Sequence, residues 1–242
     1  MGRTPTRTRR APGATGTGLV IAIDGPSAAG KSSVGQEVAR RLGYAFLDTG
    51  NLYRALTWLA LRRGVPVEDE EALAALARRA RMRLAPAAPG SPEPSAILVE
   101  GEDVTPHLRR PEVEALVSQV ARVPAVRQAL LALQRRLAGR GGVVMAGRDI
   151  GTVVLPAAQL KVYLDASPDE RARRRHRELQ AQGLRVPLSQ VAQELARRDQ
   201  IDSQREAAPL RPAQDAVIVQ TDGLTLAQVV ARVMGLVAQR LA

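Results

Sequence analysis

Short apolar runs rich in β-branched residues recur along the chain. They lie at residues 19–24, 45–48, 143–146, 160–165 and 216–220. Between them, apolar residues recur at helical spacing over residues 33–42, 113–139 and 226–241. Thr225 precedes the last of these stretches and has Gln228 three residues on, the pattern of a capping box at a helix N-terminus. Strands that alternate with helices predict an α/β fold, a five-stranded parallel sheet flanked by helices.

Three stretches depart from this alternation. Residues 82–104 place a Pro- and Gly-rich segment between short apolar runs, which predicts a small antiparallel element with a flexible tip. Residues 167–170 form a capping box with Pro168 at the first helical position and open an arginine-dense helix over 171–182. Residues 1–18 carry four arginines and no acid, which favours a disordered basic tail over a mitochondrial-type presequence or an RNA-binding arm.

Composition narrows the classes of function. The chain has 242 residues and a formal net charge of +11, which draws attention to phosphate-bearing partners. Hydrophobic residues make up 45% of it, enough for a real core, yet no apolar run is long enough to span a bilayer. The absence of cysteine excludes disulfides, a thiolate nucleophile and thiolate-bound metals. Aromatic residues at 2% argue against a single-strand nucleic-acid binder built on base stacking.

The most specific motif follows the first apolar run. Residues 25–32 match the phosphate-binding loop pattern GxxxxGK[ST] at every fixed position, directly after a predicted strand and before a predicted helix. Backbone N–H groups of such a loop, together with the helix N-terminus, point at phosphate oxygens. Lys31 is one of only two lysines, and its ammonium can reach the β- and γ-phosphates of ATP, while the Ser32 hydroxyl can reach Mg²⁺. The residues expected to bind ATP are Gly25, Pro26, Ser27, Ala28, Ala29, Gly30, Lys31, Ser32 and Ser33.

The loop alone does not identify the reaction, because GTPases, ATPases and small-molecule kinases share it. A GTPase needs an Asn-Lys-x-Asp base reader, and the only asparagine, Asn51, is followed by Leu52. A motor-type ATPase needs an apolar strand that ends in Asp-Glu, whereas the strand at 143–146 runs into Gly147 and Arg148. A kinase remains. Its acceptor would carry a phosphate if arginines converge on it, and Arg198, Asp202 and Arg205 fall on one face of a predicted helix.

These motifs, taken together, resemble bacterial cytidylate kinases, which belong to the nucleoside monophosphate kinase group. The resemblance runs from about residue 19 to residue 241 and rests on residues 23–32, 47–54, 98–104, 117–121, 126–130, 146–154 and 198–205. It implies a phosphate-loop kinase with an inserted small α/β acceptor-binding subdomain and a helical lid. Many relatives have Gly-Lys-Gly-Thr where this chain has Gly-Lys-Ser-Ser, which leaves the Mg²⁺ position to Ser32 and makes Ser33 the less certain of the two.

The resemblance also implies a role for each acceptor-side residue. Thr49, Arg54, Arg148 and Arg205 would hold the acceptor phosphate; Ser118, Arg127 and Asp149 would read the cytosine; and Tyr53, Arg198 and Asp202 would line the sugar. The chemistry agrees, since the Asp149 carboxylate accepts from the 4-amino group of cytosine and repels the carbonyl of uracil. Arg171 and Arg175 share a face of the lid helix, and we expect them, with Lys31 and Arg148, to neutralise the transferring phosphoryl group.

The predicted activity is therefore direct transfer of the γ-phosphoryl group of ATP to CMP or dCMP with Mg²⁺, in a cytoplasmic monomer that binds neither nucleic acid nor membrane. The expected division is a tail (1–18), a core domain (19–50, 106–166 and 186–242), an acceptor-binding insert (51–105) and a lid (167–185). Two alternatives stay open: a phosphate-loop kinase for UMP or a hydroxyl-bearing metabolite, and a basic nucleic-acid-binding protein that uses ATP only structurally.

Overall fold

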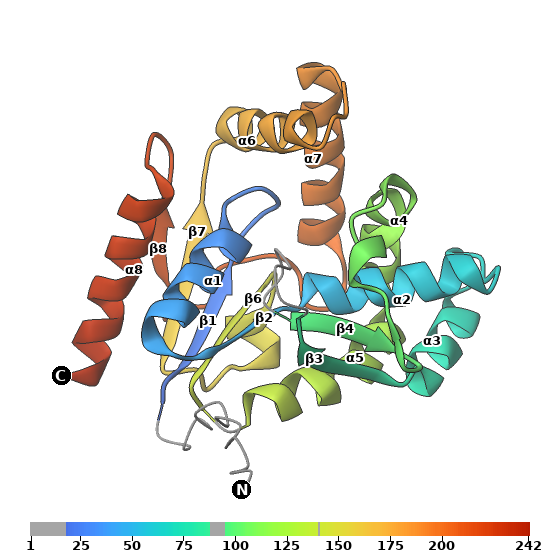
Figure 1. Ribbon diagram of the computed structural model, residues 1–242, viewed down its shortest axis with the longest axis horizontal. Coiled ribbons are helices and arrows are strands. Elements are labelled where there is room, and N and C mark those ends of the chain that lie inside the picture. The colour runs from blue at the N-terminus through green and yellow to red at the C-terminus, as the bar shows by residue number, and fades with distance from the viewer. Residues whose placement is uncertain (1–17, 88–94, 140) are drawn as a thin grey trace, which may run out of the picture.

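The central sheet is parallel and has five strands, in the order β2-β6-β1-β7-β8 (Figure 1). The computed structural model describes residues 18–87, 95–139 and 141–242, so the expected tail lies almost wholly outside the described residues, as does the tip at 88–94. The strands are β1 (Val20–Asp24), β2 (Ala45–Asp48), β6 (Val143–Gly147), β7 (Leu160–Asp165) and β8 (Val217–Gln220). The predicted fold class is confirmed, and each predicted strand is present within one or two residues.

Helices cover both faces of this sheet. On one face, α1 (Lys31–Leu42) and α8 (Leu226–Leu241) bury Val34, Val230 and Val233 against Ile21 and Ile23 of β1. On the other face, the end of α5 (Pro124–Ala138) and a short π-helix, η2 (Ile150–Val154), pack on Ala22 and Met145. Side chains of a strand alternate between faces, so β1 needs apolar residues throughout, and this is why its sequence reads as a continuous apolar run. The capping box of α8 is present as predicted.

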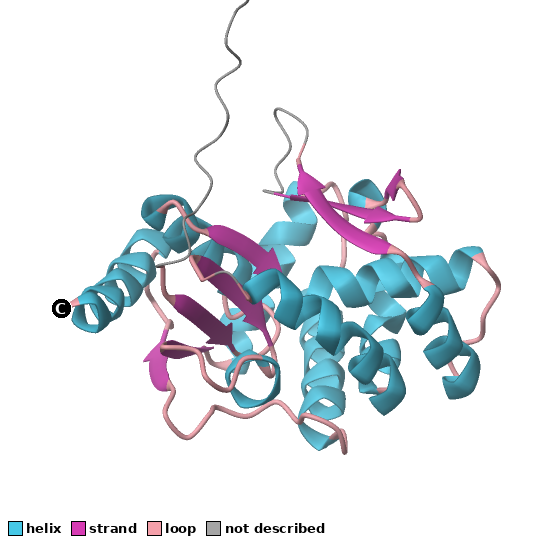
Figure 2. Ribbon diagram, turned by 90° about the horizontal axis from the view of Figure 1, so that it is seen from below, coloured by secondary structure: helices cyan, strands magenta, loops and turns pink. Residues whose placement is uncertain are grey.

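A second unit lies beside the carboxyl ends of β2 and β6 (Figures 1 and 2). It contains α2 (Gly50–Arg62), α3 (Glu70–Arg79) and an antiparallel sheet of β3 (Met82–Pro86), β4 (Ser95–Val99) and β5 (Glu102–Asp103). This sheet confirms the antiparallel element expected at 82–104. After a 3₁₀ turn, η1 (Thr105–His107), the chain enters α4 (Pro111–Arg122) and α5 (Pro124–Ala138).

The single helix expected at 113–139 is wrong, since the structure has two. Pro124 disfavours the α-helical conformation of the residue before it, and Val123 is extended, with φ −66° and ψ 116°. Both helices bury apolar residues, among them Val117 and Leu130, in one cluster with Leu52 and Leu56 of α2. The packing therefore joins α4 and α5 to the acceptor-side unit, whereas the sequence placed residues 106–166 with the core domain.

The arginine-dense segment forms a helix that packs against the helix following it in the chain (Figure 1). Helix α6 (Pro168–Ala181) begins after Ser167, whose hydroxyl accepts from the Glu170 N–H as predicted. The reciprocal half of the predicted capping box is wrong, because the Ser167 N–H donates to Asp222 and the Glu170 carboxylate pairs with Arg174 instead. Helix α6 packs on α7 (Leu188–Gln204) through Ala172, Val191 and Leu195. None of the helices in the described ranges is long and apolar enough to cross a membrane.

The buried face of α2 gives a direct test of this packing. Leu56 is fully buried, whereas Leu61 on the same helix is 38% exposed. We expect Leu56→Ala to lower the free energy of unfolding by about 2–5 kcal/mol, because it removes buried methyl groups and leaves a cavity. The matched change Leu61→Ala should lower it by less than about 1 kcal/mol. Urea unfolding followed by circular dichroism measures both, and equal losses would contradict the packing described.

Candidate functional site

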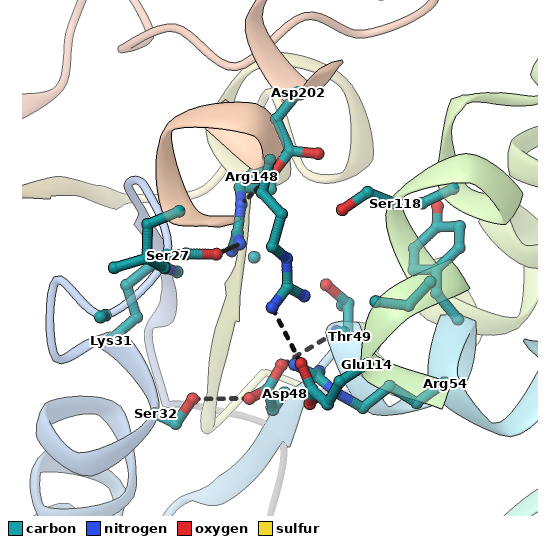
Figure 3. Close-up of a pocket in the computed structure, with 18 of the residues that line it drawn as sticks. Ser27, Lys31, Ser32, Asp48, Thr49, Arg54, Glu114, Ser118, Arg148 and Asp202 are labelled. Carbon is teal, nitrogen blue, oxygen red and sulfur yellow. Dashed lines mark hydrogen bonds and ion pairs between the residues drawn. The ribbon is translucent and has the colours of Figure 1, made fainter. Parts of the chain in front are cut away.

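A cavity of about 460 Å³ opens at the carboxyl ends of β1, β2 and β6. Its lining comes from the phosphate loop, from the starts of α1 and α2, from α4 and from the α6–α7 pair (Figure 3). Eight basic and five acidic side chains line it. Parallel strands place their carboxyl ends side by side, so segments distant in sequence meet at one edge of the sheet. The resulting site is concave, strongly polar and basic.

The loop at residues 25–30 has the backbone that phosphate binding requires. Gly25 and Gly30 have φ of +147° and +92°, and a Cβ on Gly25 would lie 2.1 Å from the Leu164 carbonyl oxygen, so glycine is needed there. Lys31 is buried at the start of α1, and its Nζ donates to the Pro26 carbonyl at 2.5 Å. Burial holds the pKa of Lys31 well below its usual range, and the nearby Arg148 adds to that effect. Of the predicted ATP-binding residues, six line the cavity: Ser27, Ala28, Gly30, Lys31, Ser32 and Ser33.

Beside the loop, a hydroxyl and a carboxylate face each other. Ser32 Oγ donates to Asp48 Oδ2 at 2.6 Å (Figure 3). Burial acts to raise the pKa of Asp48, but Arg54 and Arg109 outweigh it and hold that pKa below its usual value. Sequence reasoning gave Asp48 no role, although it ends the strand next to β6. The described residues contain no cluster of three or more His, Cys, Asp or Glu that would hold a metal alone. A hydroxyl plus one ionised carboxylate nevertheless fits Mg²⁺, which prefers oxygen ligands and normally completes its shell with phosphates and water.

On the acceptor side, Arg148 reaches across the cavity floor. Its Nε donates to Asp202 Oδ2 at 2.8 Å and a terminal nitrogen donates to Ser27 Oγ at 2.6 Å, which links β6, α7 and the phosphate loop. Arg205 lies 3.6 Å from Asp149 and 3.8 Å from Asp202. Thr49 is buried at the start of α2, and its hydroxyl donates to the Ala146 carbonyl at 3.0 Å rather than capping the helix.

The residues expected to read a base also converge. A terminal nitrogen of Arg127 donates to Asp149 Oδ2, and another donates to the Ala121 carbonyl at 3.0 Å. The Arg127 guanidinium lies over the Tyr53 ring, 5.3 Å from its centroid. Ser118 is buried on α4 and lines the same cavity. The cavity therefore offers a carboxylate, a guanidinium and a hydroxyl to a bound base.

A carboxylate that sequence reasoning missed ties two arginines together. Glu114 Oε1 accepts from Arg54 Nε at 2.7 Å, and Oε2 accepts from Arg198 at 2.9 Å. Burial acts to raise the pKa of Glu114, but Arg54 and Arg198 outweigh it and hold that pKa far below the usual range. Arg109, which also lines the cavity, lies 3.5 Å from the same carboxylate. These contacts span 60 and 84 residues, so no local spacing signals them.

The two lid arginines predicted as a pair differ in position. Arg175 lines the cavity and forms an ion pair with Glu178 at 3.1 Å. Arg171 is buried, where it donates to the carbonyls of Ser27 and Ala166 and pairs with Asp199 at 2.6 Å. Arg171 thus holds the phosphate loop against α6 and α7 and does not line the cavity.

A further buried acid anchors the segment that carries Arg148 and Asp149. Asp24 ends β1 and accepts from the N–H groups of Ile150 and Gly151, both at 2.7 Å. Burial raises the pKa of Asp24 to about 6, although the two N–H groups act in the opposite direction. The carboxylate therefore fixes the start of η2 at the edge of the sheet.

This raised pKa makes the contribution of Asp24 to stability depend on pH. Its pKa in the unfolded chain is near 3.8, so the contribution is complete below pH 4 and is lost as pH rises through 6, by roughly 3 kcal/mol in all. Asp24→Asn removes the titration. We expect the unfolding free energy of the variant, relative to the unmodified protein, to rise between pH 4 and 7. Urea unfolding across that range measures it, and a constant difference would contradict the raised pKa.

Comparison with known proteins gives consistent results. A family model described as cytidylate kinase matches residues 21–239. The cytidylate kinases of Geobacillus kaustophilus and Geobacillus thermodenitrificans are each 51% identical to the chain over 223 residues, which is 92% of this chain and 98% of theirs. A bifunctional pantoate ligase/cytidylate kinase of Synechococcus sp. is 50% identical over 222 residues, which is 92% of this chain and 41% of that protein.

Proposed function

The chain belongs to the cytidylate kinase family, and from this premise we propose that it transfers the γ-phosphoryl group of ATP to CMP or dCMP, giving ADP and CDP or dCDP. One observation carries the proposal: a single cavity is lined both by a phosphate loop and by Ser118 and the Asp149 carboxylate with its partner Arg127. The first binds a nucleotide triphosphate, and the second matches the hydrogen-bonding edge of cytosine.

In the acceptor half, we propose that Asp149 accepts from the 4-amino group of cytosine while Arg127 and Ser118 donate to its other polar atoms. Tyr53, Arg198 and Asp202 then line the sugar. The residues proposed to hold the acceptor phosphate are Thr49, Arg54, Arg148 and Arg205. These side chains all line the cavity and come from α2, α4, α5, α7, the residues that flank them and the segment after β6, which supports one continuous binding surface.

The reaction needs no covalent intermediate. An oxygen of the acceptor phosphate, already anionic, attacks the γ-phosphorus in line, and the bond to the β-phosphate oxygen breaks as ADP leaves. Lys31 and the loop N–H groups hold the donor phosphates, and Arg148 and Arg175 line the same cavity. They stabilise charge on the transferring group, whereas Arg171 keeps the loop and lid aligned. Positioning and charge neutralisation therefore dominate, with no general base.

We propose that Mg²⁺ is held by the Ser32 hydroxyl, with Asp48 beside it, together with phosphate oxygens of ATP. The ion would neutralise charge on the β- and γ-phosphates. The short Ser32–Asp48 contact and the lowered pKa of Asp48 support this assignment, because an ionised carboxylate stands where the ion is needed.

The test is an ADP-release assay with CMP, dCMP, UMP, AMP and GMP as acceptors. We expect the highest kcat/KM with CMP or dCMP and a lower value with UMP, because its O4 carbonyl meets the Asp149 carboxylate. A higher kcat/KM with UMP would support the alternative kinase. ADP release without any acceptor would point to a hydrolase.

We propose that the enzyme acts as a monomer, and the presence of the phosphate loop and the proposed acceptor residues in one cavity of a single chain supports this. The positive charge of the cavity is then used for two small nucleotides rather than for nucleic acid. We propose that the enzyme acts in the cytoplasm. Residues 167–185 remain the proposed lid, and we extend the proposed acceptor-binding unit to α4 and α5.

A further inference from the structure

Glu114 is a largely buried acidic residue of the cavity to which no substrate group is assigned. Asp48 stands beside the proposed Mg²⁺ position, Asp149 faces the base and Asp202 the sugar, while Glu178 is 56% exposed on α6. Glu114 is nearly as buried as these site acids, with 11% of its side chain exposed. Burying a carboxylate is unfavourable unless charged partners compensate for it, so its partners indicate what it does.

Those partners are arginines of the acceptor half. Both carboxylate oxygens of Glu114 are engaged, one by Arg54 from α2 and the other by Arg198 from α7. Arg54 is a proposed ligand of the acceptor phosphate, and Figure 3 shows it beside Glu114 at the edge of the cavity. A carboxylate held by two guanidinium groups resembles a phosphate group in charge and hydrogen bonding.

We propose that Glu114 is a positioning residue that acts as a built-in counter-anion of the acceptor site. It keeps Arg54 and Arg198 aligned before the acceptor arrives, and it limits the affinity of these arginines for a phosphate group. This inference rests on the proposed function of the acceptor half. It predicts that removal of the negative charge, with the shape retained, makes the site bind bare anions more tightly.

The experiment is a calorimetric titration of E114Q and the unmodified enzyme with inorganic phosphate, with saturating ADP to occupy the phosphate loop. We expect the Kd for phosphate to fall about tenfold in E114Q, because one unit charge is removed within a few ångströms of the anion. The control is E112Q, which makes the same change on the same helix at a side chain that is 55% exposed. It should leave the Kd within about twofold, since exposed charges are screened.

An unchanged or higher Kd in E114Q would overturn the proposal, because a residue that only maintains structure would loosen the site when altered. If E114Q fails to fold, E114D replaces it. That variant keeps the charge but draws it back from the two arginines, so a smaller fall in Kd is expected, and no fall would again overturn the proposal. The titration does not depend on which acceptor is phosphorylated, so its failure is distinguishable from failure of the acceptor assay.

Discussion

Lys31→Met is expected to lower kcat/KM for CMP phosphorylation by at least about a hundredfold, or about 3 kcal/mol of transition-state stabilisation. Lys31 is buried at the start of α1 and hydrogen-bonds to the phosphate loop itself, so its ammonium is positioned by the loop that would hold ATP. Methionine keeps the apolar stem and removes only the charge. The loss should appear mainly in kcat, because charge on the transferring group is greatest in the transition state.

The chain offers a matched control for this change. Lys161 is the only other lysine, is equally buried, and pairs with Asp215 at 2.9 Å. It does not line the cavity, so Lys161→Met should lower stability while kcat stays within about threefold. Steady-state kinetics with thermal unfolding of both variants separates the two effects. Turnover of Lys31→Met near that of the unmodified enzyme would contradict the role of the loop.

The structural features that could be predicted from the sequence are those determined by residues close together in the chain. The phosphate loop is continuous in the chain, and its glycines, lysine and serine act within one turn. The strands are predictable because a parallel strand covered on both faces must be apolar along its whole length. The caps of α6 and α8 likewise depend on residues only three apart.

Two kinds of feature could not be predicted in this way. The periodicity of α4 and α5 continues across residue 123, and only the backbone restriction imposed by Pro124 separates them. The roles of Asp48 and Glu114 depend on partners 16 to 84 residues away, which become neighbours only when the sheet edge and α7 are assembled. The family resemblance assigned roles to the acceptor residues that align with its motifs, but it assigned no role to Glu114.

The two lid arginines show what helical spacing can and cannot predict. Arg171 and Arg175 lie four residues apart and share a face, as expected. Arg171, near the start of that face, contacts the Ser27 carbonyl of the phosphate loop and pairs with Asp199. Arg175, one turn later, lines the cavity. Spacing identifies the face, and the packing of α6 on α7 decides what each position on it contacts.

Asp149→Asn is expected to lower kcat/KM for CMP by at least about a hundredfold and to raise the ratio of UMP to CMP use. Arg127 donates to one oxygen of Asp149, so the asparagine must turn its own oxygen toward Arg127. Its amide NH₂ then faces the base. That group opposes the 4-amino donor of cytosine but donates well to the O4 carbonyl of uracil. A single atom therefore changes which base is accepted.

The KM for ATP tests whether this effect is confined to the base. The ion-pair partners of Asp149 are Arg127 and Arg205, not the lysine or serines of the phosphate loop, so that KM should change by less than about threefold. Asp103→Asn, the same replacement at an exposed position of β5, should change neither acceptor use nor KM. If Asp149→Asn lowered the use of CMP and UMP equally, the carboxylate would only hold Arg127 and Arg205 in place, and base selection would have to come from other residues.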